Sequence, residues 1–255
     1  MILAQLNPIG LYTSKDKRLW DDLISNTFTV KYVTNKLPAI SLVVSGIVTG
    51  TIKLYDCEDN EISSLLNLTD TVGESLDNTV CTLLSYAGSI LTGKEDGFYY
   101  YKITLSDTTV LYSDMFEWIT DTSDLVKFSF SNCLNLLVGD VSMSVPAWDF
   151  YLEYDASADK FEKTIEVDDD RGINNASSGT AYKIYAISLI IDKNVYDILN
   201  VLPIIRGNGN VTCSFNGEDH IMDNIEIEDG DYFVQIRHIT LKFVDRYKIF
   251  SMLNA

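Results

Sequence analysis

Short apolar runs separated by polar, glycine- or asparagine-containing turns repeat along the whole chain. In Gly50–Tyr55, Ile52 and Leu54 alternate with Thr51, Lys53 and Tyr55, which predicts a strand with one buried and one solvated face. About seven such strands within about 100 residues are typical of a β-sandwich. The other runs of the first half are Thr27–Val33, Ile40–Val44, Val80–Tyr86, Phe98–Leu105, Val110–Trp118 and Leu125–Phe130.

The clearest hairpin signal joins Phe98–Leu105 to Val110–Phe116 through the polar turn Ser106–Thr109. Several tyrosines of this hairpin are candidates for a sugar-stacking platform. Because successive residues of a strand point to opposite faces, we expect consecutive tyrosines to pack on both sides of the sheet instead. The tyrosines concerned are Tyr99, Tyr100, Tyr101 and Tyr112.

The strand pattern resumes after Thr122 and is interrupted by one long polar stretch. Asp168–Gly179 is rich in aspartate, asparagine, serine and glycine, which predicts a loop that projects from the surface and is available for contacts. The predicted strands are Ala147–Tyr154, Phe161–Val167, Ala181–Ile191, Asn210–Phe215, Ile225–Ile227 and Tyr232–Val244.

One segment has helical spacing. Lys193–Leu202 follows a potential N-cap, Asp192, and is closed by Pro203. Its apolar residues recur at the i, i+3, i+4, i+7 spacing, so we expect a helix that lies as a lid on a β core. These residues are Val195, Ile198, Leu199 and Leu202.

The last predicted strand, Tyr232–Val244, changes phase. Val234 and Ile236 occupy even-numbered positions and so one face of a strand, whereas the later apolar residues occupy odd-numbered positions and the other face. One extra residue produces such a change, so the pattern predicts a β-bulge or bend near Arg237 and His238. The later residues are Ile239, Leu241 and Phe243.

The length of 255 residues favours two domains. We therefore predict a mainly β protein of two β-sandwich-like domains, immunoglobulin-like or jelly-roll-like, with one short helix near 193–202. The domains span 22–122 and 123–255. Residues 1–21 are either an arm that a neighbouring subunit orders or the first strand of the first domain.

The composition limits the partners. Hydrophobic residues make up 46% and charged residues 22% of the chain, which is typical of a folded protein. The net charge of -18 repels phosphate backbones and anionic lipid, so we expect neither nucleic acid nor a membrane as a partner. The absence of a signal peptide and of long apolar runs predicts a protein that stays in the cytoplasm where it is made, unless a larger assembly carries it out.

Residues suited to catalysis or to metal binding are sparse. His220 lies in a polar turn and His238 alternates with polar residues, so both are predicted to be surface residues. The glycines of Arg206–Asn210 follow the helix rather than precede it, which indicates a turn and not a phosphate site. No catalytic sequence motif occurs, and we expect no enzyme, no catalytic residues and no cofactor.

Cysteines and acidic clusters support the same expectation. The wide spacing of Cys57, Cys81, Cys133 and Cys213 is typical neither of a zinc site nor of a disulfide framework. The clusters Asp56–Glu61 and Asp168–Asp170 lack the alternating spacing of a calcium loop and are predicted to be solvated turns. A carboxylate pair for glycoside hydrolysis stays possible, but 37 acidic residues single out no pair.

The hairpin residues carry a resemblance to a known family. Gly97-Phe98-Tyr99-Tyr100-Tyr101-Lys102-Ile103 matches a G-x-Y-Y-x-x-I strand, and Tyr112-Ser113-Asp114-Met115-Phe116 matches Y-S-[DE]-x-F. In this order they resemble a pattern in virion proteins of phages and prophages of the Bacteroidetes, including crAss-like phages. The strand Leu125–Cys133 and the helix before the last strands extend the likeness to about two thirds of the chain, mainly 40–135 and 180–250.

The resemblance implies a structural role. Such proteins include tail, ring and baseplate-like components, and the shared motifs are structural, with no catalytic residue among them. We therefore expect a component of a phage tail or connector, assembled in the host cytoplasm, which forms a ring of its own copies beside neighbouring tail or portal proteins. The alternative is a glycan-binding β-sandwich, lectin-like or receptor-binding, that uses the tyrosines with Trp118 or Trp148; a hydrolase is a third option.

Overall fold

The computed structural model describes residues 2–5, 7–15, 29–66, 68–74, 80–131, 136–138, 141–143, 147–155, 160–166, 178–205, 210–233 and 236–253. Within these residues the protein is mainly β, as predicted. The first half contains β1 (Ile2–Gln5), β2 (Leu11–Tyr12), β3 (Lys31–Val33), β4 (Ile40–Ser45), β5 (Gly50–Asp56), β6 (Glu61–Leu66), β7 (Thr69–Glu74), β8 (Val80–Tyr86), β9 (Gly97–Leu105), β10 (Val110–Ser113) and β11 (Phe116–Ile119). The second half contains β12 (Leu125–Ser131), β13 (Leu136–Val138), β14 (Val141–Met143), β15 (Trp148–Asp155), β16 (Lys160–Glu166), β17 (Ser178–Asp192), α1 (Lys193–Ile205), β18 (Asn210–Phe215), β19 (Glu218–Phe233) and β20 (Ile236–Leu253).

The first half combines a separate sheet with part of a larger one. Its four-stranded sheet has the order β1-β4-β8-β7, while β5, β9, β10 and β11 belong to a sheet of 14 strands that continues into the second half. Alternation along β5 is as predicted, because Ile52 and Leu54 are buried and their neighbours are not. Both residues belong to one core with Leu42 of β4 and Leu84 of β8.

The predicted β9–β10 hairpin is confirmed, with Leu111 opposite Ile103. The predicted strand Val110–Trp118, however, is interrupted at Asp114 and Met115. Tyr112 lies opposite Lys102, and Phe116 lies opposite Tyr99. Four residue steps therefore face three steps of β9, so the chain between β10 and β11 contains one extra residue. Such an extra residue redirects a side chain, and the carboxyl group of Asp114 is buried here.

Pairing in the second half runs in a closed circuit, from β15 through β12, β18, β19, β20 and β17 back to β15. The buried residues of these strands form the second part of the core. They include Phe128 and Phe130 of β12, Phe150 and Leu152 of β15, Cys213 of β18, Met222 of β19, Leu241 and Phe243 of β20, and Ile187 and Leu189 of β17.

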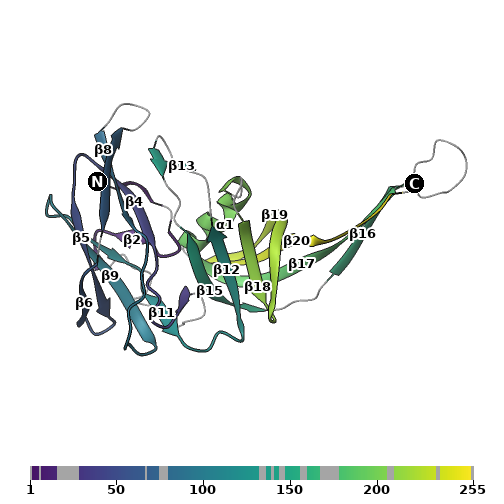
Figure 1. Cartoon of the computed structure of the whole chain (residues 1–255), viewed down its shortest axis with the longest axis horizontal. Helices are drawn as coiled ribbons and strands as arrows, with labels where there is room; N and C mark the ends of the chain where they lie inside the picture. Colours follow the sequence, from purple (N-terminus) through teal and green to yellow (C-terminus); the bar gives the residue numbers. More distant parts are fainter. Residues whose placement is uncertain are drawn as a thin grey trace, which may run out of the picture.

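The helix α1 packs against β17, β19 and β20 of this circuit, as predicted for a lid (Figure 1). The main-chain N–H of Val195 donates to Asp192 Oδ1 at 2.8 Å, which confirms Asp192 as the N-cap. Val195, Ile198 and Leu199 are fully buried. The predicted end at Leu202 is wrong, since α1 continues to Ile205. Pro203 lies in the last turn, where its missing N–H costs a single hydrogen bond.

A long ribbon projects away from the body of the protein (Figure 1). It is formed by β17 and β20, which pair from Asp192↔Ile236 to Ser178↔Leu253, and by β16, which pairs with β17. The two long strands therefore contribute to the closed circuit at one end and to the ribbon at the other.

The predicted strand Tyr232–Val244 is wrong, because it spans two strands. β19 ends at Phe233 and β20 begins opposite it at Ile236, so the chain reverses direction within the predicted strand. From Ile236 to Val244, β20 keeps a constant register with β17, which excludes the predicted bulge at Arg237 and His238. The irregularity lies in β19 instead, between Asp229 and Tyr232. Val234 lies outside the described residues.

The two halves meet where β3 and β15 pair, at Lys31 and Tyr151. The predicted boundary at residue 122 falls in the turn between β11 and β12, and buried residues on both sides of it form one connected core. The ammonium group of Lys31 is buried and lies 3.1 Å from Glu117 of β11 and 3.2 Å from Glu153 of β15.

Replacing the buried cation at this joint should destabilise the protein. Lys31→Met leaves two carboxylates near each other without their shared counter-charge, so we expect a loss of about 2 kcal/mol in urea unfolding. Lys53→Met is the control, because Lys53 pairs with Glu61 at the exposed surface. Equal stability of the two variants would contradict the role assigned to Lys31.

Candidate binding pocket

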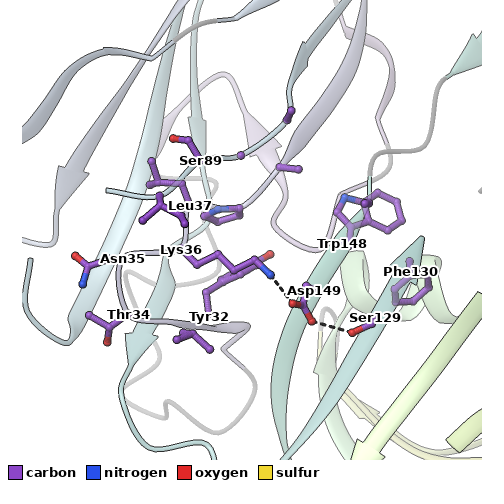
Figure 2. A pocket seen from close by; sticks show the side chains of 17 residues that line it. Tyr32, Thr34, Asn35, Lys36, Leu37, Ser89, Ser129, Phe130, Trp148 and Asp149 are labelled. Carbon is purple, nitrogen blue, oxygen red and sulfur yellow. Dashed lines mark hydrogen bonds and ion pairs between the residues drawn. The ribbon is translucent and has the colours of Figure 1, made fainter. Parts of the chain in front are cut away.

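A pocket of about 780 Å³ lies between the two halves of the chain. One wall is the segment 32–39, which begins within β3 and continues beyond it, and a second is the loop 87–90 after β8. The opposite wall is formed by the end of β12 and the start of β15 (Figure 2). Its volume falls within the range of ligand pockets, and its walls are mostly apolar.

The pocket forms because β3 and β15 diverge beyond their single paired position. The segment after β3 turns toward the loop after β8. There Lys36 and Ile90 form an isolated antiparallel β-bridge, and the Leu37 N–H donates to the Ser89 carbonyl at 2.9 Å. Gly88 is required for this approach, since it has φ +75° and a Cβ there would lie 2.6 Å from the Leu37 carbonyl oxygen. The opposite wall stays paired, with Phe130 facing Trp148.

Charged groups in the pocket are paired with one another. Lys36 forms an ion pair with Asp149, as Figure 2 shows, and the Ser129 hydroxyl donates to Asp149 at 2.8 Å. Lys127 lies 2.9 Å from the same carboxylate. Burial alone raises the pKa of Asp149, but the hydrogen bonds from Lys36, Lys127 and Ser129 outweigh it and hold the pKa below its ordinary value. Asp149 is therefore a stabilised anion, poorly suited to accept or donate a proton in catalysis.

Two polar atoms of the lining lack a partner. The Tyr32 hydroxyl and Trp148 Nε1 are buried without a hydrogen bond among the described residues, and their residues are only 2% and 3% exposed. Burial, followed by the charges of Asp149 and Asp192, raises the pKa of Tyr32, so its hydroxyl keeps its proton. Unpaired buried donors are rare in folded proteins and call for an explanation.

The tyrosines of the β9 hairpin pack on both sides of the sheet, as predicted. Tyr99 and Tyr101 contact Phe116 in the core, whereas Tyr100 stacks on Tyr55 on the other face, with ring centroids 5.5 Å apart. Burial and a hydrogen bond to Asp59 raise the pKa of Tyr100 to about 12. Trp118 and Trp148, considered for stacking on a glycan, are buried as well.

The prediction that His220 lies at the surface is wrong. The turn before it consists of Asn216 and Gly217 alone, so His220 already belongs to β19 and faces inward beside Cys213. Its ring centroid lies 4.4 Å from that of Tyr185 and 4.7 Å from that of Phe215. His238 is exposed, as predicted.

The acidic cluster Asp56–Glu61 forms an exposed turn between β5 and β6, as predicted. Asp56 Oδ1 accepts main-chain N–H groups from Glu58 at 2.9 Å and from Asn60 at 2.8 Å. Among the described residues, no three histidine, cysteine or acidic side chains gather as metal ligands. Asp168–Asp170, the loop up to Ser177 and Cys133 lie outside the described residues, while Cys57, Cys81 and Cys213 are free thiols.

A buried carboxylate pair, Asp114 and Asp192, has no counterpart in the sequence predictions. Asp114 Oδ2 accepts hydrogen bonds from the Gly10 N–H at 3.2 Å, the Tyr12 hydroxyl at 3.1 Å and Asn194 Nδ2 at 3.1 Å. Burial, followed by the charge of Asp114, raises the pKa of Asp192 to about 8. Burial and the neighbouring charge of Asp114 therefore favour the protonated form of Asp192.

Comparisons with protein-family models, with curated proteins and with solved structures gave no match. In the part of the chain described above, no helix is long and apolar enough to cross a membrane. A function must therefore be inferred from the arrangement of the residues themselves.

Proposed function

We propose that this chain is a structural component of a phage virion, in the tail or connector, which forms a ring through protein–protein contacts and catalyses no reaction. The hairpin motifs that resemble phage virion proteins lie in β9, β10 and β11. Their residues Ile103, Ser113 and Phe116 are fully buried, which fits motifs that maintain a fold rather than a site.

The projecting ribbon is the observation that carries the proposal. A small ribbon of strands gains little stability by itself in water, and its outer strands offer main-chain groups to other chains. At the far end of the ribbon, β16 and the last residues of β20 are paired with β17 alone among the described strands. A neighbouring subunit that binds this ribbon would satisfy those edges.

Two further features support assembly over catalysis. The charged groups of the pocket neutralise one another, and Asp149, the carboxylate beside the Ser129 hydroxyl, is held by Lys36 and Lys127 as a weakly basic anion. The proposal includes two β-sandwich-like domains. The shared core of β4, β8 and β5 supports this arrangement in the first half, whereas the second half has its closed circuit of strands.

One surface favours the alternative function, binding of a glycan. Tyr55 and Tyr112 are partly exposed on the outer face of β5 and β10, and Lys102 Nζ lies 5.8 Å from the centroid of the Tyr55 ring. However, the faces of these rings are partly used by Tyr100 and by lysines. This leaves less aromatic surface for a sugar than an open platform offers.

Light scattering and electron microscopy distinguish the two functions. We expect multi-angle light scattering of the purified protein to give a mass several times 28.7 kDa at high concentration, and negative-stain images to show rings. A monomer at every concentration, together with binding on a glycan array, would replace the proposal with the glycan-binding alternative. Hydrolysis that disappears on a single carboxylate substitution would overturn both.

A further inference from the structure

The rim of the pocket is apolar and exposed. Ile90 is 80% exposed, more than any other large apolar residue described, and Val33 on the neighbouring wall is 38% exposed. Both residues line the same pocket, whose inner wall contains the buried rings of Phe130 and Trp148. Apolar surface that continues from a pocket onto its rim is typical of a site that a second protein covers.

The wall formed by β15 has a free edge. β15 pairs with β12 along one side, but on its other side it pairs with β3 at Tyr151 and with β17 from Tyr154 onward. No described strand pairs with Trp148, Asp149 or Phe150 on that second side. Because main-chain groups alternate in direction along a strand, some of those in this stretch are turned away from β12 and toward the pocket.

The unpaired donors match the groups of a peptide chain. An indole N–H can only donate, and a Tyr hydroxyl with a raised pKa remains a donor. Both Trp148 Nε1 and the Tyr32 hydroxyl therefore suit carbonyl oxygens, which every peptide supplies. Because both atoms are buried, such an oxygen reaches them only when the lining side chains shift. A purely apolar small molecule would fill the volume but leave both donors unpaired.

From these features we propose that the pocket binds an extended segment of a partner protein. One bulky apolar side chain of the segment enters between Ile90 and Trp148, and its main chain lies along the free edge of β15. The net charge of -18 favours a partner segment that is neutral or basic around this anchor. The inference rests on the proposed function, because it names the chemistry of one assembly partner.

A displayed library of random linear peptides, selected on the full-length protein, tests the inference. We expect enriched peptides to share a bulky apolar residue with neutral or basic neighbours. Ile90→Asp and Ala87→Trp should weaken their binding at least about tenfold, because the first places a charge on the rim and the second narrows the pocket. Ile47→Asp is the matched control, since Ile47 is 73% exposed and lies outside the pocket.

The outcomes separate the alternatives. Peptides without a shared apolar anchor, or with equal affinity for Ile90→Asp and Ile47→Asp, would overturn the inference. A third result would also overturn it: no peptide is enriched, but the dye 1-anilinonaphthalene-8-sulfonate binds the unaltered protein and does not bind Ala87→Trp. The pocket would then accept small apolar molecules and not a peptide. Ring formation in electron micrographs is scored separately, so failure of peptide binding and failure of the proposed function are distinguishable. Thermal unfolding of each variant confirms that it is folded.

Discussion

The free energy of unfolding should fall by roughly 1 kcal/mol per pH unit between about pH 5 and pH 8. In this range Asp192 is ionised in the unfolded chain but holds its proton in the folded protein, where its pKa is about 8. A raised pKa contributes stability that is complete below the unfolded value and is lost as the pH rises through the folded value. Urea unfolding at a series of pH values measures the slope.

Asp192→Asn should remove most of this slope. Asparagine is also a good N-cap, so its side-chain oxygen can still accept from the Val195 N–H, but it has no proton to lose. Asp114 can then remain ionised beside its donors Gly10, Tyr12 and Asn194 without a second negative charge.

Asp197→Asn is the matched control for this pair. Asp197 belongs to the same helix, but its carboxylate is exposed and pairs with Lys193. We expect this variant to keep the slope of the unaltered protein. If Asp192→Asn kept the slope as well, the titration would have to be assigned to another group.

Trp118→Ala should lower the free energy of unfolding by about 3–5 kcal/mol. The indole is fully buried, with its centroid 4.2 Å from that of Tyr99 and 6.0 Å from that of Phe116. Its Nε1 also donates to the Lys36 carbonyl at 2.8 Å, which fixes the segment that forms one wall of the pocket. Removal of the ring leaves a cavity and an unpaired carbonyl group together.

Trp118→Phe separates these two effects in the same urea experiment. Phenylalanine keeps much of the apolar volume but lacks the N–H, so we expect a smaller loss of about 1–3 kcal/mol. Ile47→Ala, at an exposed position, should change stability by less than about 0.5 kcal/mol. Equal losses in Trp118→Phe and Trp118→Ala would mean that the hydrogen bond, and not the packing, accounts for the effect.

Sequence patterns predicted elements that carry their own apolar alternation. The bounds of β8 and β18 were predicted correctly, and those of β4, β5, β9 and β12 to within a residue. β6 and β7 were missed because serine, threonine and acidic residues interrupt their apolar alternation, and their pairing with β5 and β8 makes them strands. β19 was predicted only at Ile225–Ile227, because acidic residues flank this apolar segment. Its full length follows from its pairing with β18 and β20.

The sites were less predictable because they depend on distant contacts. The pocket joins residues after β3 and β8 to the ends of β12 and β15, and no local pattern places these segments together. Asp192 was recognised as a helix cap, but its partner Asp114 is brought to it by the interruption between β10 and β11. His220 was misplaced because it follows a polar stretch that suggests a long turn. The actual turn has only two residues, so His220 already lies in a strand.

The two long strands also determine how the protein would bear mechanical load. β17 runs from the tip of the ribbon to Asp192, a length of roughly 50 Å at the rise of an extended strand. A neighbour that pulls along this axis loads the β17–β20 ladder in shear, so many hydrogen bonds must break together. A sideways pull at the tip opens the same ladder one bond at a time. The ribbon is therefore built to resist tension along its length and to yield to bending.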